Sequence, residues 1–230
     1  MTRSTTPARR NTVLQTHHSV DDVWAAAVLA DQINQGYVRE TQYSMDLAAG
    51  VQQVVKETNR TVMMTSLYNP DVITDQLRQA GRELRQQLSQ ELTLRMLRGT
   101  TNDFDRSIQQ ALAVTTQFST VAHRMELAVI PCLPDSLRRS QTRAQADAVL
   151  RQCQPVLADV GAKVDLRVRV VRCFFSKNHG VDFVTAVTPD NCAVMFSYKQ
   201  AFEPDTELTI RGTVRGHGAD LTRLNRVKVI

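Results

Sequence analysis

The spacing of hydrophobic residues changes near Gly161, and this change constrains the fold more than any other feature of the chain. Before Gly161, apolar residues recur every three to four positions, as on one side of an α-helix. After it, apolar and polar residues alternate, as in a strand with one buried face. In KVDLRVRVVRCFFS (163–176), Val164, Leu166, Val168 and Val170 share one side, and Asp165, Arg167 and Arg169 share the other. We therefore predict an α+β fold, with a mainly helical domain over 11–160 and a β domain over 161–230.

Four further segments of the β domain have the same alternation. They cover 180–188, 192–198, 207–217 and 221–230. Pro-Asp-Asn at 189–191 and Gly-His-Gly at 216–218 are typical of the turns between such strands. Gly212 is expected on the inner side of its strand, where a missing side chain lets the strand coil sharply. Five short strands with these turns predict a small closed barrel.

The last seventy residues resemble an OB-fold, the five-stranded barrel of many single-strand-binding proteins. The resemblance rests on a long first strand, a hairpin to the next two strands, and a final hairpin. The final segment is also similar to that of phage-type nucleic-acid-binding proteins, in Gly212, Thr213, Val214, Arg215 and His217, then Thr222, Leu224, Arg226, Val227, Lys228 and Val229. The resemblance to an OB-fold covers about a third of the chain. The connector KQAFEPD (199–205) departs from the pattern, because many OB-folds carry a helix there.

The region before Gly161 predicts several helices. Ser19, followed three residues later by Asp22, is typical of a helix start, and Gly36 of a helix end. Asn69 and Pro70 begin a long helix to residue 98, and further helical stretches cover 102–130 and 134–161. Between the first two helices, strands are expected at 11–16, 37–45 and 61–68, with a weakened helix at 46–58. A small α/β unit over 11–68 is therefore one interpretation of this part.

Positive charge gathers at the two ends of the sequence. Residues 1–10 hold three Arg and no acid, and we expect a flexible basic arm there. Residues 162–230 hold eleven Lys and Arg against seven Asp and Glu, while the whole chain has a net charge of +5. Such clustering favours a polyanionic partner. A solvated face, or an edge strand protected by charge, is the alternative explanation.

The candidate nucleic-acid-binding residues are the outward-facing cations of the barrel strands and turns, with one histidine and one tyrosine. They are Arg167, Arg169, Arg172, Lys177, Tyr198, Lys199, Arg211, Arg215, His217, Arg223, Arg226 and Lys228. Arginine can hold a phosphate through two hydrogen bonds or stack on a base. Aromatic faces on which bases could stack are Phe174, Phe183, Phe196 and Tyr198. Since Phe174 and Phe175 are adjacent in a strand, we expect one of them to face inward.

The motifs for other chemistry are weak. His17, His18, Asp21 and Asp22 could be read as metal ligands, as could Cys173, His179, Cys192 and His217, but neither spacing is that of a known zinc site. Gly212–Gly218 lacks the Lys-Ser/Thr pair of a phosphate loop. We expect no metal, no cofactor and no catalytic residues. Four cysteines without a C-x-x-C pair indicate reduced thiols and a cytoplasmic protein, in the host cytoplasm if it is viral.

No apolar run is long enough to span a membrane, and the first residues lack the apolar core of a secretory signal, although their Arg, Ser and Thr content also fits an organellar transit peptide. The sequence predicts a non-enzymatic protein that binds single-stranded nucleic acid, most simply DNA, in a phage or bacterial replication or recombination system. The helical region is expected to form a homo-oligomer or to hold a protein partner. The alternative is a structural or adaptor protein, such as a virion component. An enzyme with its site in the N-terminal α/β unit is a third interpretation.

Overall fold

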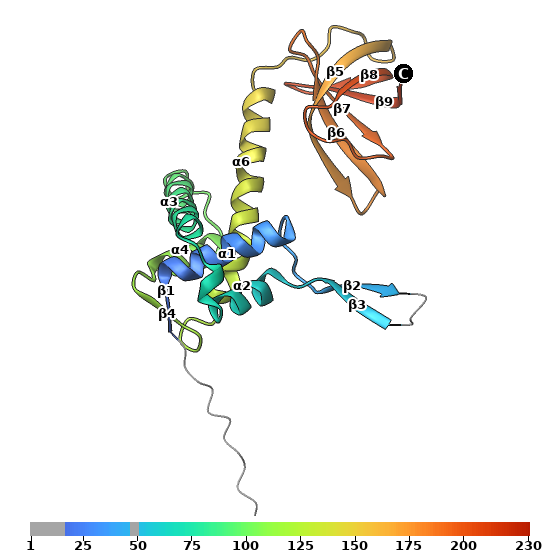
Figure 1. The fold of residues 1–230 in the computed structure, drawn as a ribbon. Coiled ribbons are helices and arrows are strands. Elements are labelled where there is room, and N and C mark those ends of the chain that lie inside the picture. Colours follow the sequence, from blue (N-terminus) through green and yellow to red (C-terminus); the bar gives the residue numbers. More distant parts are fainter. Residues whose placement is uncertain (1–16, 47–50) are drawn as a thin grey trace, which may run out of the picture. The chain divides into compact units, whose positions relative to one another are not determined.

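A computed structural model describes residues 17–46 and 51–230 of the 230-residue chain. The chain divides into two compact units, Met1–Arg138 and Arg139–Ile230. Figure 1 shows the helices of the first unit and the barrel of the second. The predicted α+β fold, helical first and then a five-stranded barrel, is confirmed. The basic arm predicted at 1–10 and the strand predicted at 11–16 lie outside the described residues.

The first unit is built around helix α1 (Val20–Asn34). The Ser19 side chain accepts a hydrogen bond from the Asp22 backbone N–H and so caps the helix, as predicted. α1 buries Trp24 together with Ala25, Ala26 and Ala27, so the neighbouring helix α3 (Asp75–Leu97) can approach closely. At Gly81 of α3 a Cβ atom would lie 2.8 Å from the Ala25 backbone nitrogen. Small residues on both helices therefore set this contact.

The remaining elements of this unit are short. They are α2 (Asn59–Leu67), the 3₁₀ turn η1 (Pro70–Val72), α4 (Asp103–Ala113), α5 (Glu126–Val129), η2 (Ile130–Cys132), and the strands β1 (His17–Ser19) and β4 (Gln117–Ser119), which pair with each other. The helix expected over 69–98 begins later, because Thr74 caps α3 and Pro70 lies in the 3₁₀ turn. The stretch expected as one helix over 102–130 is α4, β4 and α5.

The α/β interpretation of residues 11–68 is wrong within the described part. Residues predicted as a weakened helix form strand β3 (Val51–Lys56), which pairs antiparallel with β2 (Gln42–Asp46). Residues 61–68, predicted as a strand, belong to helix α2. Thr58 caps α2, and the buried Asn59 side chain accepts from Val38 N–H and donates to the Gly36 carbonyl. These contacts start a helix that the β-branched composition did not indicate.

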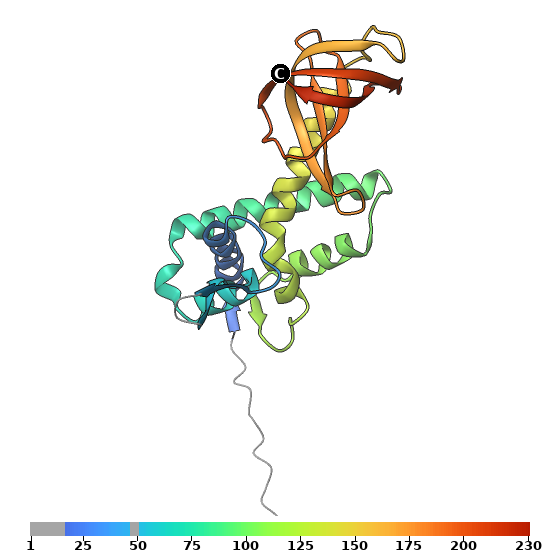
Figure 2. The same cartoon turned by 90° about the vertical axis from the view of Figure 1, so that its right-hand side faces the viewer.

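Helix α6 (Leu133–Leu150) begins in the first unit and ends in the second. The barrel follows it, with strands β5 (Lys163–Ser176), β6 (Val181–Val187), β7 (Ala193–Tyr198), β8 (Glu207–His217) and β9 (Thr222–Val229). They close in the order β5-β6-β7-β9-β8, and β7 and β9 run parallel. The predicted boundary near residue 160 lies between α6 and β5. Figure 2 shows the strands wrapping around one another.

The barrel interior is small and apolar. Val168, Val170, Val184, Phe196 and Ile210 are all nearly inaccessible to solvent. The alternation seen in the sequence holds along β5 and β8, where inward residues are buried and the arginines between them are exposed. Gly212 lies on the inner side as expected, with the Val227 and Leu224 side chains against it. The closed ring with this strand order fits an OB-like fold.

Candidate nucleic-acid interface

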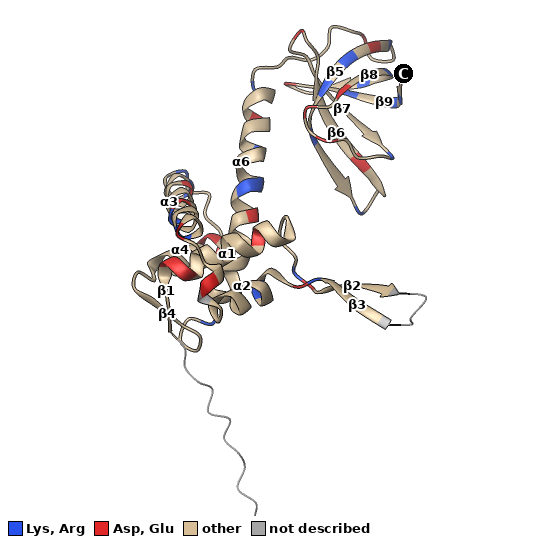
Figure 3. Cartoon of the chain, in the orientation of Figure 1, with Lys and Arg blue, Asp and Glu red and all other residues tan. Residues whose placement is uncertain are grey.

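The twelve candidate residues lie in five places on the barrel. Arg167, Arg169 and Arg172 are on β5, Lys177 is in the β5–β6 turn, Tyr198 and Lys199 are at the end of β7, Arg211, Arg215 and His217 are on β8, and Arg223, Arg226 and Lys228 are on β9. Figure 3 shows blue segments on β5, β8 and β9, with red segments among them. The positive charge of these strands is therefore interspersed with carboxylates.

Three of the candidate arginines form ion pairs with carboxylates of the same barrel. Arg211 binds Asp165 across β8 and β5, and Arg167 binds Glu207 with 2.6 Å between Nη2 and Oε2. Arg169 binds Asp205, the last residue of the connector. The hydrogen bonds from Arg211 hold the pKa of Asp165 below its ordinary value, and those from Arg167 lower the pKa of Glu207. A phosphate would compete with a carboxylate for each of these guanidinium groups.

Arg172 is also paired, with a carboxylate of helix α6. Its Nη1 lies 3.1 Å from Asp147 Oδ1, and both side chains are partly exposed. Across the β5–β6 pair, Arg172 faces Thr185. This arginine therefore links the end of α6 to the outer face of the barrel.

The cations at the β8–β9 end of the barrel are different. Arg215, Arg223, Arg226 and Lys228 are exposed, and none of them forms an ion pair with any residue in the described ranges. Lys228 faces Arg211 across the two strands, and Arg223 faces Gly216. The two strands slip in register on each side of Val214, which leaves Arg215 at a bulge. This β8–β9 cation group (Arg215, Arg223, Arg226, Lys228) is the largest part of the predicted site that is available to an anion. Lys177 and Lys199 are also exposed and without an ion pair among the described residues.

His217 has a structural role at the end of β8. Its Nε2 lies 2.8 Å from the Ala158 carbonyl oxygen, which can only accept, so this nitrogen carries the proton. Nδ1 then accepts from the Thr222 hydroxyl at 2.9 Å, and the same hydroxyl oxygen accepts from the Val156 N–H. Both ring nitrogens are thus used to fix the β8–β9 turn to the segment before β5.

Two exposed aromatic side chains of the barrel lie at the β5–β6 hairpin. Phe174 is 51% exposed and Phe175 is 59% exposed, so the expectation that one of them faces inward is wrong. This end of β5 pairs with β6 alone among the described strands, so neither side of it faces the barrel interior. Phe174 stacks on Phe183 with ring centroids 5.3 Å apart and planes 17° apart, and His179 meets the edge of Phe183.

The other two stacking candidates are not free platforms. Phe196 is buried in the barrel core, and Tyr198 is half-buried against Phe202, at a centroid distance of 5.3 Å. Phe175 and His179 were not among the predicted nucleic-acid-binding residues. The turn sequence SKNHG (176–180) could have indicated them, because residues in and beside such a turn lie at the exposed tip of a hairpin.

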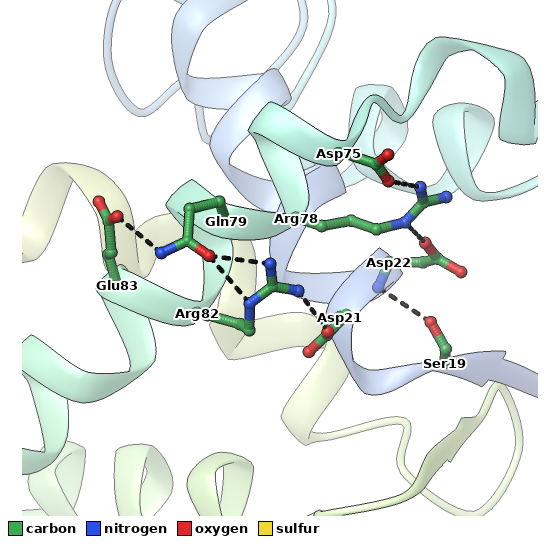
Figure 4. A network of polar contacts seen from close by, with 8 residues as sticks. All are labelled: Ser19, Asp21, Asp22, Asp75, Arg78, Gln79, Arg82 and Glu83. Carbon is green, nitrogen blue, oxygen red and sulfur yellow. Dashed lines mark hydrogen bonds and ion pairs between the residues drawn. The ribbon is translucent and has the colours of Figure 1, made fainter.

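Asp21 and Asp22, two of the four possible metal ligands near the start of α1, are paired with arginines of α3. Asp22 binds Arg78 at 2.8 Å and Asp21 binds Arg82 at 2.7 Å (Figure 4). Within 17–46 and 51–230, no three His, Cys, Asp or Glu side chains come together in a way that could hold a metal ion. In the same ranges, none of the helices is both long and apolar enough to cross a membrane.

Comparison of the chain with protein-family models, with curated proteins and with solved structures gave no match. The fold and the residues described above are therefore the basis for any functional conclusion.

Proposed function

We propose that the C-terminal barrel binds single-stranded nucleic acid without catalysing a reaction. The observation that carries this proposal is the β8–β9 cation group, whose four positive side chains are exposed and lack ion pairs within the described residues. Single-strand binding by small barrels combines such cations, which follow the phosphates, with aromatic faces on which bases stack. The exposed Phe174 and Phe175 supply the aromatic part. By its resemblance to phage-type binding proteins, DNA in a replication or recombination system of a phage or bacterium is the preferred target.

The test is fluorescence anisotropy of the full chain with a labelled oligo-dT of about thirty nucleotides, longer than the site of one such barrel. The informative variant is Arg215→Gln with Arg223→Gln, which removes two cations of the β8–β9 group. Its matched control is Arg167→Gln with Arg169→Gln, which removes the same charge from arginines already paired with Glu207 and Asp205. The first variant should bind at least about tenfold more weakly, and its salt dependence should fall by roughly 0.7 per lost contact.

The control variant should stay close to wild type, because its arginines are held by carboxylates. Equal losses in both variants would mean that net charge attracts the strand and that the β8–β9 group is not a site. Wild-type protein without any salt-sensitive binding would refute nucleic-acid binding altogether.

Protein–protein contact through the first unit is the second candidate function, and the β2–β3 hairpin favours it. Tyr43, Met45 and Val54 are exposed on one face of this two-stranded sheet, and Val55 is exposed on the other face. An isolated pair of strands is only marginally stable in water, and exposed apolar side chains in one patch mark interaction sites. A second copy of the chain, or another protein, would cover them. Light scattering of the wild type and of Tyr43→Ser with Val54→Ser tests this, since an assembly through the hairpin should dissociate in the variant.

A further inference from the structure

The last turns of helix α6 lie on the outer face of the barrel. Ala146 of α6 is buried against Val171 of β5, Val187 of β6 and Ala193 of β7, with Val149 and Leu150 packed beside it. Val187 and Ala193 are neighbours on the two strands, and they point away from the barrel interior. α6 therefore covers one end of the β6–β7 face, which is the face that ligands use in barrels of this type.

The next row of side chains on this face crosses four strands and has an arginine at each end. Arg172 faces Thr185, Thr185 faces Met195, and Met195 faces Arg223. Arg223 belongs to the unpaired β8–β9 cation group, whereas Arg172 is held by Asp147 of α6. One row further on, Phe174 and Phe183 face each other, and Phe174 is exposed. The β6–β7 face is therefore covered by α6 at one end and exposed to solvent near Phe174 at the other.

Two buried polar atoms next to the covered end have no partner within 17–46 and 51–230. They are the hydroxyl oxygen of Thr185, which is fully buried, and the Nε of Arg172. Burying polar groups without partners is unfavourable, so these atoms weaken the covered arrangement. The contact made by α6 is also small, because Val149 and Leu150 are only partly buried and the Arg172–Asp147 pair is partly open to solvent.

We infer that the end of α6 is a displaceable cover, and that Asp147 occupies on Arg172 the position that a phosphate of the bound strand takes when the cover lifts. This inference rests on the proposed function. A carboxylate oxygen and a phosphate oxygen make the same charge-assisted hydrogen bond to a guanidinium group, so they compete for it. Uncovering Arg172 extends the cation row from Arg223 across the face to β5. The cover then weakens nucleic-acid binding in the resting protein.

The test compares Asp147→Asn with Glu207→Gln in the full chain, using the same oligo-dT anisotropy assay. Both variants remove one negative charge from an arginine pair of the barrel, but only Asp147 belongs to α6. Asp147→Asn should tighten binding about tenfold, the effect of gaining one charged hydrogen bond, and should steepen the salt dependence by roughly 0.7. Glu207→Gln should change the affinity less than about twofold, because its partner Arg167 faces Thr209 and not a cation of the β8–β9 group, and exposed charges act weakly at a distance.

A second variant and a second measurement complete the design. In the Asp147→Asn background, Arg172→Gln should remove the gain, so that the double variant binds no more tightly than Arg172→Gln alone. Hydrogen exchange of the amides in 143–150 should become faster on addition of the oligonucleotide. Equal effects of Asp147→Asn and Glu207→Gln, in a wild type that binds, overturn the cover while leaving the proposed function intact. No binding by the wild type or by Asp147→Asn overturns both.

Discussion

Arg211 and Asp165 meet in a two-point ion pair across strands β8 and β5, with Nε 2.7 Å from Oδ1 and Nη2 2.6 Å from Oδ2. The pair shows why an exposed arginine on this barrel is not by itself a binding residue. The same strand alternation that turns Arg211 outward also turns Asp165 outward, and the register places them opposite each other. In the resting state, the carboxylate of Asp165 therefore neutralises the charge of Arg211.

The Arg211–Asp165 pair predicts a small acid sensitivity. Arg211 lowers the pKa of Asp165 in the folded protein, so the pair stabilises the fold above the ordinary Asp pKa of about 3.9. This contribution is lost as the pH falls through the lower folded-state pKa. The difference in denaturant midpoint between wild type and Asp165→Asn should therefore be small near neutral pH and should vanish at lower pH. Asp220→Asn, which removes a carboxylate without an ion pair among the described residues, should show no such convergence.

Gly81→Ala should destabilise the first unit. The added Cβ would lie 2.8 Å from the Ala25 nitrogen and 2.9 Å from the Trp24 carbonyl carbon, both backbone atoms that cannot turn aside. Overpacking of this kind costs about 1–3 kcal/mol. Thermal unfolding checks it, with Gly216→Ala as the control, because nothing lies within 4 Å of a Cβ built there. Equal stability of the two variants would show that α1 and α3 can move apart without cost.

Val168→Asp should unfold the barrel. Val168 is 1% exposed and packs among the apolar side chains of the interior, so its replacement buries a carboxylate without a partner. Thr209→Asp on the neighbouring strand is the control, since residue 209 is exposed and faces Arg167. Denaturant unfolding followed by circular dichroism should show loss of the cooperative β transition in the first variant alone. A native transition for Val168→Asp would mean that this position is reached by solvent.

Asn59→Ala should loosen the segment between α1 and α2. The buried Asn59 amide accepts from Asn34 Nδ2 and from the Val38 N–H, each at 2.8 Å, and donates to the Gly36 carbonyl at 3.0 Å. Leaving such groups buried and unpaired costs about 1–3 kcal/mol each. Asn225→Ala, at an exposed position of β9, should cost much less. Unfolding midpoints of the two variants give the comparison, and similar values would show that water replaces the lost contacts.

The barrel could be predicted because, in each strand, the alternation of apolar and polar residues indicates which side is buried. Val164, Leu166 and Val168 alternate with polar residues, and that period of two is lost if the segment is a helix. The segment 51–67 lacks such an alternation. Val54 and Val55 are both exposed on β3, and Thr61 and Val62, despite β-branching, lie in α2. The structure of 51–67 depends on pairing with β2 and on the Asn59 contacts, which no local pattern reveals.

The candidate site was predictable only as far as the direction of its side chains. Alternation identified Arg167 and Arg211 as outward-facing, and the structure agrees. Which arginines are neutralised depends on the register between β5 and β8, whose paired residues are about forty positions apart in the chain, as in Arg167 and Glu207. The cover on Arg172 depends on the path of α6. Such distant relationships leave no trace in a single sequence.

The parallel contact between β7 and β9 also bears on how the barrel is made. β9 closes the ring by joining β7 to β8, and it is the last of the five strands in the chain. Until that strand has left the ribosome, β7 and β8 each keep an open edge, and Val194 and Ile210 lack the neighbours that seal them. A chain that ends before β9 should therefore aggregate and be sensitive to proteases, because four of the five strands leave two edges unpaired and the apolar interior exposed.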